Sequence, residues 1–286
     1  DGNFSSINNN AGSSITGFDA ISITSPVSGE IVNAGTVTGT DAAVIISKAL
    51  NGSVTNNAGG VLQSTGGAAT VFITAGSVNA INNNVGGLIK GVGLTNSTIF
   101  VSGLSAGTVN NAGTIQADTT QAILFGPAAT FTGINNTGTI TSATGGATIA
   151  AGALAIVKGI TVNGISYGLV NSGNITNTGA GKAIDFSVAD VPVLQQGGTI
   201  TGDVLLSRGG GTVLTMTGGT INGAVTSSST TASTLNLAGG SILKTVTLGD
   251  VNGNIVNLSE TSLQTINGGN NNDTFNITGG SFVALD

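Results

Sequence analysis

The chain of 286 residues contains no cysteine, no histidine and no tryptophan, and only 6% of its residues are charged. Without cysteine it can form neither a disulfide nor a thiolate metal site. Without histidine it can form neither a Ser-His-Asp nor a Cys-His catalytic arrangement, and no zinc site with imidazole ligands. Carboxylates are therefore the catalytic groups left to consider, and no cofactor is expected.

Basic side chains are also scarce. Six Lys and Arg residues stand against twelve Asp and Glu residues, which gives a net charge of −6 at pH 7. Nucleic acid is not expected as a partner, because its phosphates require a basic surface. No window approaches the roughly 18 uninterrupted apolar residues of a membrane span, so none is expected.

The chain is rich in glycine, with 48 residues, and in asparagine, and the two recur together. Seven times, an Asn-rich turn ending in Gly precedes a short aliphatic segment. These glycines stand at positions 12, 35, 59, 86, 113, 138 and 173, so the steps are 23, 24, 27, 27, 25 and 35 residues. A repeat of this length, built from short aliphatic strands and Gly/Asn turns, indicates the coils of a β-solenoid.

A shorter repeat follows from residue 193. Its turns have their second residue at positions 198, 219, 240, 261 and 280, so the steps are 21, 21, 21 and 19 residues. The segment before each turn alternates apolar and polar residues, as in Leu235-Asn-Leu237, which is typical of a strand with one buried face. We interpret residues 1–192, with repeats of about 25 residues, and 193–286, with repeats of about 21, as one continuous solenoid.

The expected fold is therefore all-β: a single-stranded β-solenoid, or parallel β-helix, of about 12 coils, one for each turn motif. Stacked coils place Ile, Val and Leu in columns inside the rod, and a spacing of about 4.8 Å per coil predicts a length of roughly 55–60 Å. Asn at equivalent turns can form amide ladders along the axis, and Asn and Gly tolerate the left-handed backbone of sharp corners. The turn residues with this structural role are Asn33, Gly35, Asn56, Gly59, Asn111, Gly113, Asn136, Gly138, Asn171, Gly173, Gly219, Gly240 and Gly280.

The 35-residue step contains an insertion, placed at residues 139–172, with the apolar stretch 147–157. Insertions in solenoids form loops on one face and often carry binding. Exposure of Leu154, Ile156 and Val157 would make an apolar partner site, whereas the simpler interpretation is that the insertion widens one coil or covers a side of the rod. Tyr167, the only tyrosine, is a candidate surface contact just after this stretch.

Three carboxylates are the candidates for catalysis. Many enzymes with a β-helix act on polysaccharides through clustered acids, and sugar chemistry needs two carboxylates at a defined separation. Asp185, Asp190 and Asp203, near Arg208, are the alternative catalytic set. Their spacings of 5 and 13 residues do not match a coil, so the sequence does not place them in one column.

Two further kinds of ligand site are suggested by partial matches to known sequence motifs. Residues 268–275 are similar to the calcium-binding Gly-Gly-x-Gly-x-Asp nonapeptide, which makes Asp273 a candidate calcium ligand, but the unit occurs once and an ordinary turn is the alternative. Thr-x-Thr pairs place two hydroxyls on one strand face, as in ice-binding solenoids: Thr36/Thr38, Thr139/Thr141 and Thr199/Thr201. Other repeats lack the pair, which favours the ordinary β-propensity of Thr.

The repeat style resembles the secreted passenger regions of bacterial autotransporters and related large surface adhesins. The resemblance covers nearly the whole chain and rests on runs such as Asn-Asn-Ala-Gly-Thr-Ile (110–115), Asn-Asn-Thr-Gly-Thr-Ile-Thr (135–141), Asn-Ser-Gly-Asn-Ile-Thr (171–176) and Leu-Asn-Leu-Ala-Gly-Gly-Ser-Ile (235–242). It implies a right-handed β-helix, located outside a Gram-negative cell, with a host or neighbouring cell surface as a partner.

The expected function is accordingly that of a non-enzymatic, extracellular structural rod. Only Asp1–Ser6 precede the first motif and only four residues follow Phe282, which is too short for a helical cap at either end. Either the rod belongs to a longer stalk, or the last coil of one copy stacks head-to-tail on the first coil of the next and builds a fibre. A polysaccharide-acting enzyme and an ice-binding solenoid remain the alternatives.

Overall fold

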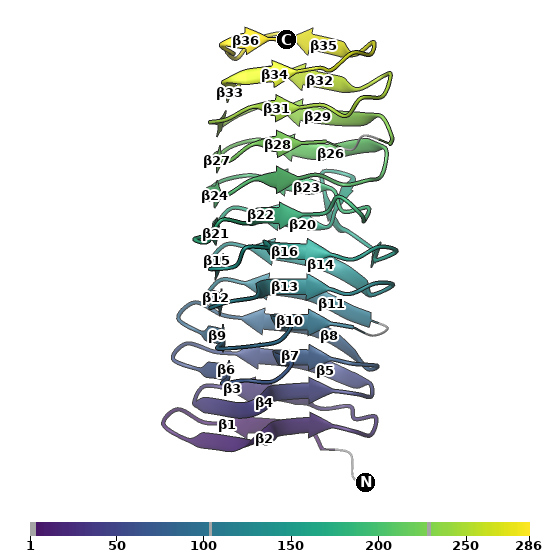
Figure 1. Cartoon of the computed structure of the whole chain (residues 1–286). Helices are drawn as coiled ribbons and strands as arrows, with labels where there is room; N and C mark the ends of the chain where they lie inside the picture. Colours follow the sequence, from purple (N-terminus) through teal and green to yellow (C-terminus); the bar gives the residue numbers. More distant parts are fainter. Residues whose placement is uncertain (1–3, 103–104, 228–229) are drawn as a thin grey trace.

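The computed structural model describes residues 4–102, 105–227 and 230–286, and these residues form strands and turns without a helix. The strands stack into a β-solenoid, which confirms the expected fold class (Figure 1). Each coil has three faces, here called A, B and C, and the strands of each face pair in parallel with those of the next coil. The described residues contain no helix of the length and hydrophobicity needed to span a bilayer.

Face A contributes one strand from each of twelve successive coils. Its strands are β1 (Ser6–Asn9), β3 (Glu30–Asn33), β5 (Leu50–Asn56), β8 (Ser77–Asn83), β11 (Ser105–Asn111), β14 (Thr130–Asn136), β20 (Leu169–Asn171), β23 (Val193–Gln195), β26 (Gly211–Met216), β29 (Ser233–Leu237), β32 (Ile255–Leu258) and β35 (Thr274–Ile277). A short strand, β17 (Ile156–Val157), pairs with the start of β14.

Faces B and C form one larger sheet, because β2 (Ser14–Ile23) and β4 (Thr36–Ile46) run through the corner between them. The other strands of face B are β6 (Val61–Ser64), β9 (Leu88–Gly91), β12 (Thr114–Ala117), β15 (Thr139–Ser142), β21 (Asn174–Asn177), β24 (Thr199–Thr201), β27 (Thr220–Asn222), β30 (Ser241–Ile242) and β33 (Ser262–Leu263). Those of face C are β7 (Ala69–Ile73), β10 (Ser97–Val101), β13 (Gln121–Phe125), β16 (Ala147–Ala151), β22 (Lys182–Asp185), β25 (Val204–Leu205), β28 (Val225–Thr226), β31 (Val246–Thr247), β34 (Thr265–Asn267) and β36 (Ala284–Leu285).

The core is a set of aliphatic columns that run along the rod. On face B, Ile115, Ile140, Ile175 and Ile200 lie in register and are fully buried. Alternating residues of each strand face inward, so the period-two pattern of the sequence becomes a continuous apolar interior. No single coil could bury these side chains, and stacking therefore stabilises every coil through its neighbours.

A buried ladder of amide side chains runs beside the core at the end of the face A strands. Each Asn donates from Nδ2 to the amide oxygen of the next coil at 2.7–2.9 Å. The ladder comprises Asn9, Asn33, Asn56, Asn83, Asn111, Asn136, Asn171 and, at its end, Gln195. The same Nδ2 atoms also donate to turn carbonyls, for example from Asn33 to Gly35 and Val61. Buried polar groups satisfied in this way stabilise the turn instead of opposing burial.

The turns after the ladder residues have two different lengths, so Gly35 and Gly59, which the repeat in the sequence aligns, are not equivalent in the structure. Two residues separate Asn33 from Thr36, whereas four separate Asn56 from Val61, although both pairs occupy the same register. Gly59 therefore does not correspond to Gly35. It has a left-handed backbone in an added turn, with φ of 76°, and Gly60 takes the place beside the ladder amide.

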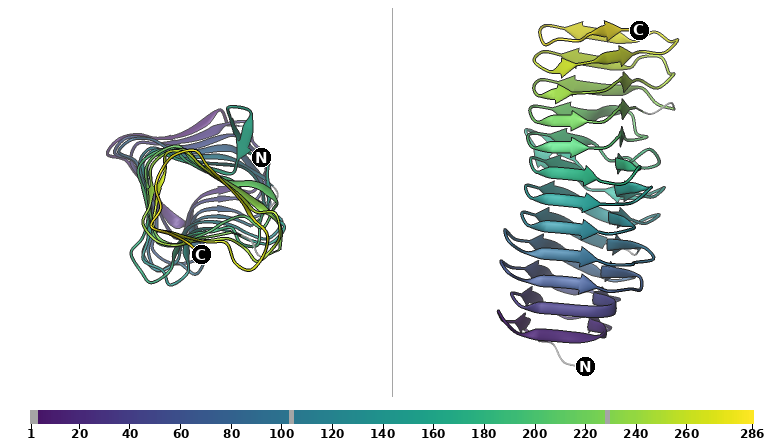
Figure 2. Two further views of the ribbon diagram at one scale, coloured as in Figure 1. Left: turned by 90° about the horizontal axis from the view of Figure 1, so that it is seen from above. Right: turned by 60° about the vertical axis from the view of Figure 1, so that its left-hand side comes forward.

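The three faces continue across residue 192 without a break. Val193 on β23 pairs with Leu169 below and Leu214 above, and Thr199 on β24 pairs with Asn174 and Thr220. The shortening of the repeat lies mainly at the corner between faces B and C, where the connection is residues 178–181 in one coil and only 202–203 in the next. Seen along the axis, the early coils protrude beyond the later ones at one corner (Figure 2).

Candidate functional site

The insertion is shorter than the expected 139–172, because β15, β16 and β20 are regular coil strands; the added residues, 158–168, pack against the outside of face A. Strands β18 (Ile160–Val162) and β19 (Ile165–Tyr167) form an antiparallel hairpin whose residues cover Val170 and Leu194 on the outer surface. Figure 2 shows this teal segment outside the outline of the coils. Outward positions that are polar in other coils, such as Asn135 and Thr215, are apolar at Val170 and Leu194 because the hairpin shields them from water.

Tyr167 is buried, so the expectation that it is a surface contact is wrong. Only 2% of Tyr167 is exposed, and its hydroxyl donates to Thr215 Oγ1 at 3.0 Å. The ring packs with Val170 and Leu194, which fixes the hairpin on face A. Leu154 and Ile156, in contrast, are largely exposed, and Val157 is partly buried against the core.

The three candidate catalytic carboxylates have separate partners. Asp185 forms an ion pair with Lys182 at 2.8 Å and accepts from the Ser187 hydroxyl at 2.6 Å. Asp190 accepts from Ser207 Oγ, and Asp203 accepts from the Ala224 amide. Asp190 and Asp203 line two different hollows, on different corners of the rod. Sugar hydrolysis by paired acids would need two of these groups to face one substrate.

Asp273 acts in a turn. Its Oδ1 accepts from the backbone amide and the side-chain amide of Asn254, one coil below, at 3.0 and 3.1 Å. Among the described residues there is no group of three or more acidic side chains placed to hold a metal ion. The observed contacts are those of a stacked turn, and the calcium hypothesis gains no support from them.

The Thr pairs lie on the outer surface of face B but do not form an unbroken array. In register with Thr36 and Thr38 are Val61 and Gln63, and above these lie Leu88 and Lys90. The pairs at 139/141 and 199/201 are separated by β21, with Asn174 and Thr176. The face is polar in its middle coils and interrupted by apolar and charged residues near its start.

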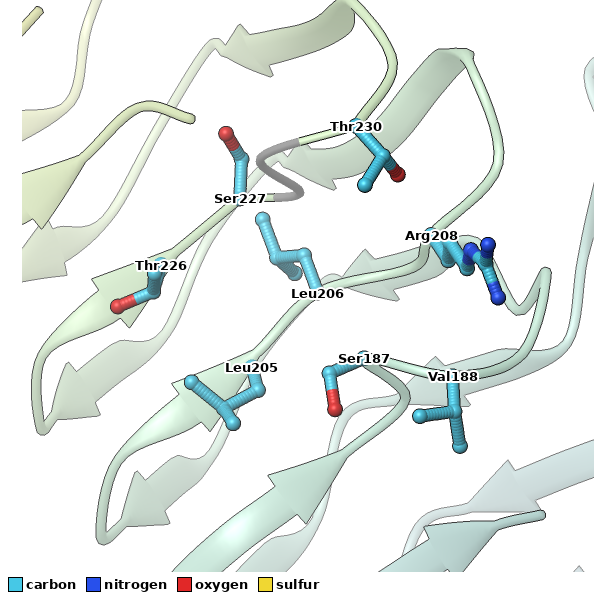
Figure 3. A pocket seen from close by; sticks show the side chains of 8 residues that line it. All are labelled: Ser187, Val188, Leu205, Leu206, Arg208, Thr226, Ser227 and Thr230. Atoms are coloured by element: carbon cyan, nitrogen blue, oxygen red, sulfur yellow. The ribbon is translucent and has the colours of Figure 1, made fainter. Parts of the chain in front are cut away.

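One hollow lies on the corner between faces C and A, where successive connections differ in length. Residues 186–192 lie on one side of the shorter connection 206–210, and Ser227 and Thr230 lie on the other (Figure 3). The hollow, of about 420 Å³, lies beside the short connection. Its lining residues are Ser187, Val188, Leu205, Leu206, Arg208, Thr226, Ser227 and Thr230 (Figure 3).

A second hollow of about 280 Å³ adjoins the first. It is lined by Leu154, Val188, Ala189, Asp190, Arg208 and Gly209, so Val188 and Arg208 border both hollows. Figure 3 shows these two side chains together on one side of the first hollow, with Leu205 and Thr226 on the opposite side. We call the two hollows and the ridge of Val188 and Arg208 between them the corner groove.

Arg208 is the only arginine of the chain and is exposed on this ridge. Two ion pairs occur in the described part of the chain, Lys182–Asp185 and Lys244–Asp203, and neither involves Arg208. The Arg208 backbone is held in place, since its amide donates to Ala189 O and its carbonyl accepts from Thr231 Oγ1. The ridge thus presents a positive charge from a fixed backbone position.

The two nearby carboxylates accept hydrogen bonds from residues other than Arg208. Burial by itself would raise the pKa of Asp185, but hydrogen bonds from Lys182 and Ser187 outweigh it and the pKa lies below its usual value. Asp190, the carboxylate that lines the groove, accepts from Ser207. The groove therefore combines aliphatic and hydroxyl side chains and the Asp190 carboxylate with Arg208, which has no ion-pair partner among the described residues.

From the sequence, Arg208 was identified only as a neighbour of the candidate carboxylates, and Val188 and Leu205 were not identified as site residues. The available signal was the uneven spacing between the aliphatic segments of residues 183–235, which reflects the unequal connections. The periodicity of the sequence does not indicate at which corner of the coil a longer or shorter connection lies.

No protein-family model, curated protein or solved structure matches the chain. The parallel β-solenoid is consistent with a β-helical passenger, and the family and activity are matters of proposal.

Proposed function

We propose that this chain is a non-enzymatic structural rod, the stalk of an adhesin of the autotransporter type on the outside of a bacterial cell. The observation that carries the proposal is the amide ladder, which passes without interruption through eight coils. A continuous buried network along the axis specifies an elongated, regular scaffold. The chain has no cysteine and so forms no disulfides, which suits a protein that must cross a membrane unfolded before it folds outside.

Labelling of intact cells that produce the protein tests this proposal. Antibodies raised against the purified rod are expected to bind unpermeabilised cells, and external protease is expected to remove the signal. Labelling that requires permeabilisation would contradict an extracellular stalk. Antibody against a cytoplasmic protein of the same cells serves as the control for membrane integrity.

A head-to-tail fibre is the second candidate, supported by the chemistry of the first and last coils. Three inner columns would continue if these coils met in a neighbouring copy: Phe275 above Ile7, Phe282 above Ile15 and Leu285 above Ile21. Phe282 and Leu285 are partly exposed, at 37% and 44%. The fourth column would not continue, because Ile277 would meet the ladder residue Asn9.

Negative-stain electron microscopy over a range of concentrations separates the two candidates. A stalk gives discrete rods of about 55–60 Å, by the spacing of about 4.8 Å per coil, and a fibre subunit gives long filaments of the same width. Ile277→Asn would place an amide donor opposite Asn9 Oδ1 and is expected to lengthen such filaments. Discrete rods for both proteins at the highest concentration would reject the fibre.

A further inference from the structure

We propose that the corner groove binds an extended peptide segment in which an acidic residue has an apolar residue two positions before it and another two positions after it. This inference goes beyond the rod function and does not depend on it. It rests on the geometry of Arg208, the two hollows beside it and the conformation of Leu154.

Arg208 determines the acidic position. A guanidinium pairs with a carboxylate through two parallel hydrogen bonds, and this pairing is stronger when the cation is not already committed. Arg208 is exposed and takes part in neither ion pair of the described residues. The chain as a whole has a net charge of −6, and Arg208 is its only arginine. A carboxylate of a partner can approach this positive charge at the corner.

The hollows determine the flanking positions. They lie on either side of the ridge, with Leu205 and Leu206 lining one and Leu154 and Ala189 the other. In an extended chain, residues i and i+2 point to the same side and are about 6.5–7 Å apart. A peptide whose acidic side chain meets Arg208 thus directs its second neighbours into the two hollows.

Leu154 is an independent sign of a binding role. It has a left-handed backbone, with φ of 64°, and 79% of its side chain is exposed. Leucine in this conformation is strained, and an exposed apolar side chain gains nothing from folding at that position. In the coil below, Ala128 has the same conformation without a large side chain. An apolar partner in the adjoining hollow gives the leucine a function.

The groove fits a peptide better than an acidic glycan. Sugar rings are commonly held by aromatic faces, and no Phe or Tyr lines either hollow, whereas Leu154, Val188 and Leu205 supply aliphatic surface.

Fluorescence anisotropy with the whole chain tests the proposal. The probe is fluorescein-labelled Val-Ser-Glu-Ser-Val, blocked at its C-terminus, and the comparison peptide carries Gln in place of Glu. The Glu peptide is expected to bind at least tenfold more tightly, as expected for a charge-assisted hydrogen-bonded pair. Arg208→Gln is expected to remove this preference, and Lys158→Gln, which removes a positive charge outside the groove, is expected to preserve it.

Leu154→Gly separates binding from structure. Relief of the left-handed strain is expected to raise the unfolding midpoint, while affinity for the Glu peptide falls severalfold. Equal binding of the Glu and Gln peptides, a preference that survives Arg208→Gln, or no binding at millimolar peptide would overturn the proposal. Displacement of the probe by oligogalacturonate at lower concentration than by unlabelled peptide would also overturn it and assign the groove to acidic glycans.

Discussion

The position that ends each strand of face A is filled in two different ways in the two regions of the rod. From Asn9 to Gln195 it holds the amide ladder, and in the last four coils it holds Met216, Leu237, Leu258 and Ile277 in the same register. In the ladder region the side chain hydrogen-bonds the turn carbonyls. In the apolar region the side chain only packs, and left-handed glycines such as Gly219, Gly240 and Gly280 form the turn.

The comparison shows that the same coil geometry has two solutions. An amide column works only as a complete series, because each member satisfies its neighbours. An apolar column depends on burial, which is additive and does not depend on direction. An amide placed in the apolar column, or an apolar residue placed in the amide ladder, should therefore lower stability more than a substitution that keeps the residue type of its region.

The largest effect is expected for Leu237→Asn. The amide would lie between Met216 and Leu258, neither of which can pair with it. Loss of a fully buried leucine together with an unsatisfied amide is expected to lower the free energy of unfolding by about 4 kcal/mol. Urea unfolding followed by circular dichroism measures this, with Leu237→Met as the matched control at less than about 1.5 kcal/mol. Equal losses for both variants would contradict the comparison.

The converse change, Asn111→Leu, should be nearly as harmful. It leaves Asn83 Nδ2 without its amide acceptor and Asn136 Oδ1 without its donor, while the volume stays similar. Unsatisfied buried groups predict a loss of about 3 kcal/mol in the same unfolding experiment. The outer-surface neighbour Asn110→Ala breaks a hydrogen bond with Asn82 and should lower stability by less than about 1 kcal/mol. A loss for Asn111→Leu no greater than that of Asn110→Ala would show that the ladder is replaceable.

Turn glycines allow a smaller test of backbone conformation alone. A Cβ at Gly12 or Gly145 would contact nothing within 4 Å, but only Gly12 has a left-handed backbone, with φ of 79°. Gly12→Ala is expected to lower stability by about 1 kcal/mol, whereas Gly145→Ala should be neutral or slightly stabilising. Thermal unfolding of the two variants measures the difference, and the same shift in both would refute a conformational cause.

Two carboxylates near opposite ends of the ladder should have opposite pH dependences. Burial, followed by the charge of Asp41, raises the pKa of Asp19 above its usual value of 3.8, whereas the pKa of Asp185 is lowered. The ionised Asp19 carboxylate lowers the stability of the folded rod. This unfavourable contribution is absent below pH 3.8 and grows as the pH rises through the folded pKa, so Asp19→Asn should stabilise the rod at pH 7.

Asp185 contributes stability above pH 3.8 that is lost as the pH falls through its lowered folded pKa. Asp185→Asn should therefore destabilise the rod at pH 7 and have little effect at the acid limit. Unfolding midpoints of both variants between pH 3 and 7 check the signs, and shifts of the same sign in both variants would contradict the assignment.

The sequence predicted the solenoid because its information is periodic. The alternation around Leu235 and Leu237 and the recurrence of Asn at turns are direct consequences of the coil, so strand direction, inward columns and ladder positions follow from them. The equivalence of Gly59 with Gly35 was wrong because a turn with two added residues preserves strand register, and spacing alone does not identify which glycine lies beside the amide.

Features that depend on contacts between non-equivalent residues were not predictable in the same way. Tyr167 is buried because a hairpin folds back on Val170 and Leu194, and nothing in the repeat specifies that contact. In the corner groove, Leu205 and Thr226 share a register position, but Val188 and Arg208 lie in connections of unequal length that the repeat does not specify.

The lengths of the strands also have a mechanical consequence. On face C, β7, β10, β13 and β16 have five residues each, whereas β28 and β31 near the other end have two; on face B, β6, β9, β12 and β15 have four residues each, whereas β30 and β33 have two. Tension between the ends loads the coils in series, and a coil with fewer interstrand hydrogen bonds opens at lower force. Under pulling, the rod should therefore extend coil by coil from its C-terminal region while the amide-ladder region remains folded, so that it yields gradually rather than breaking at once.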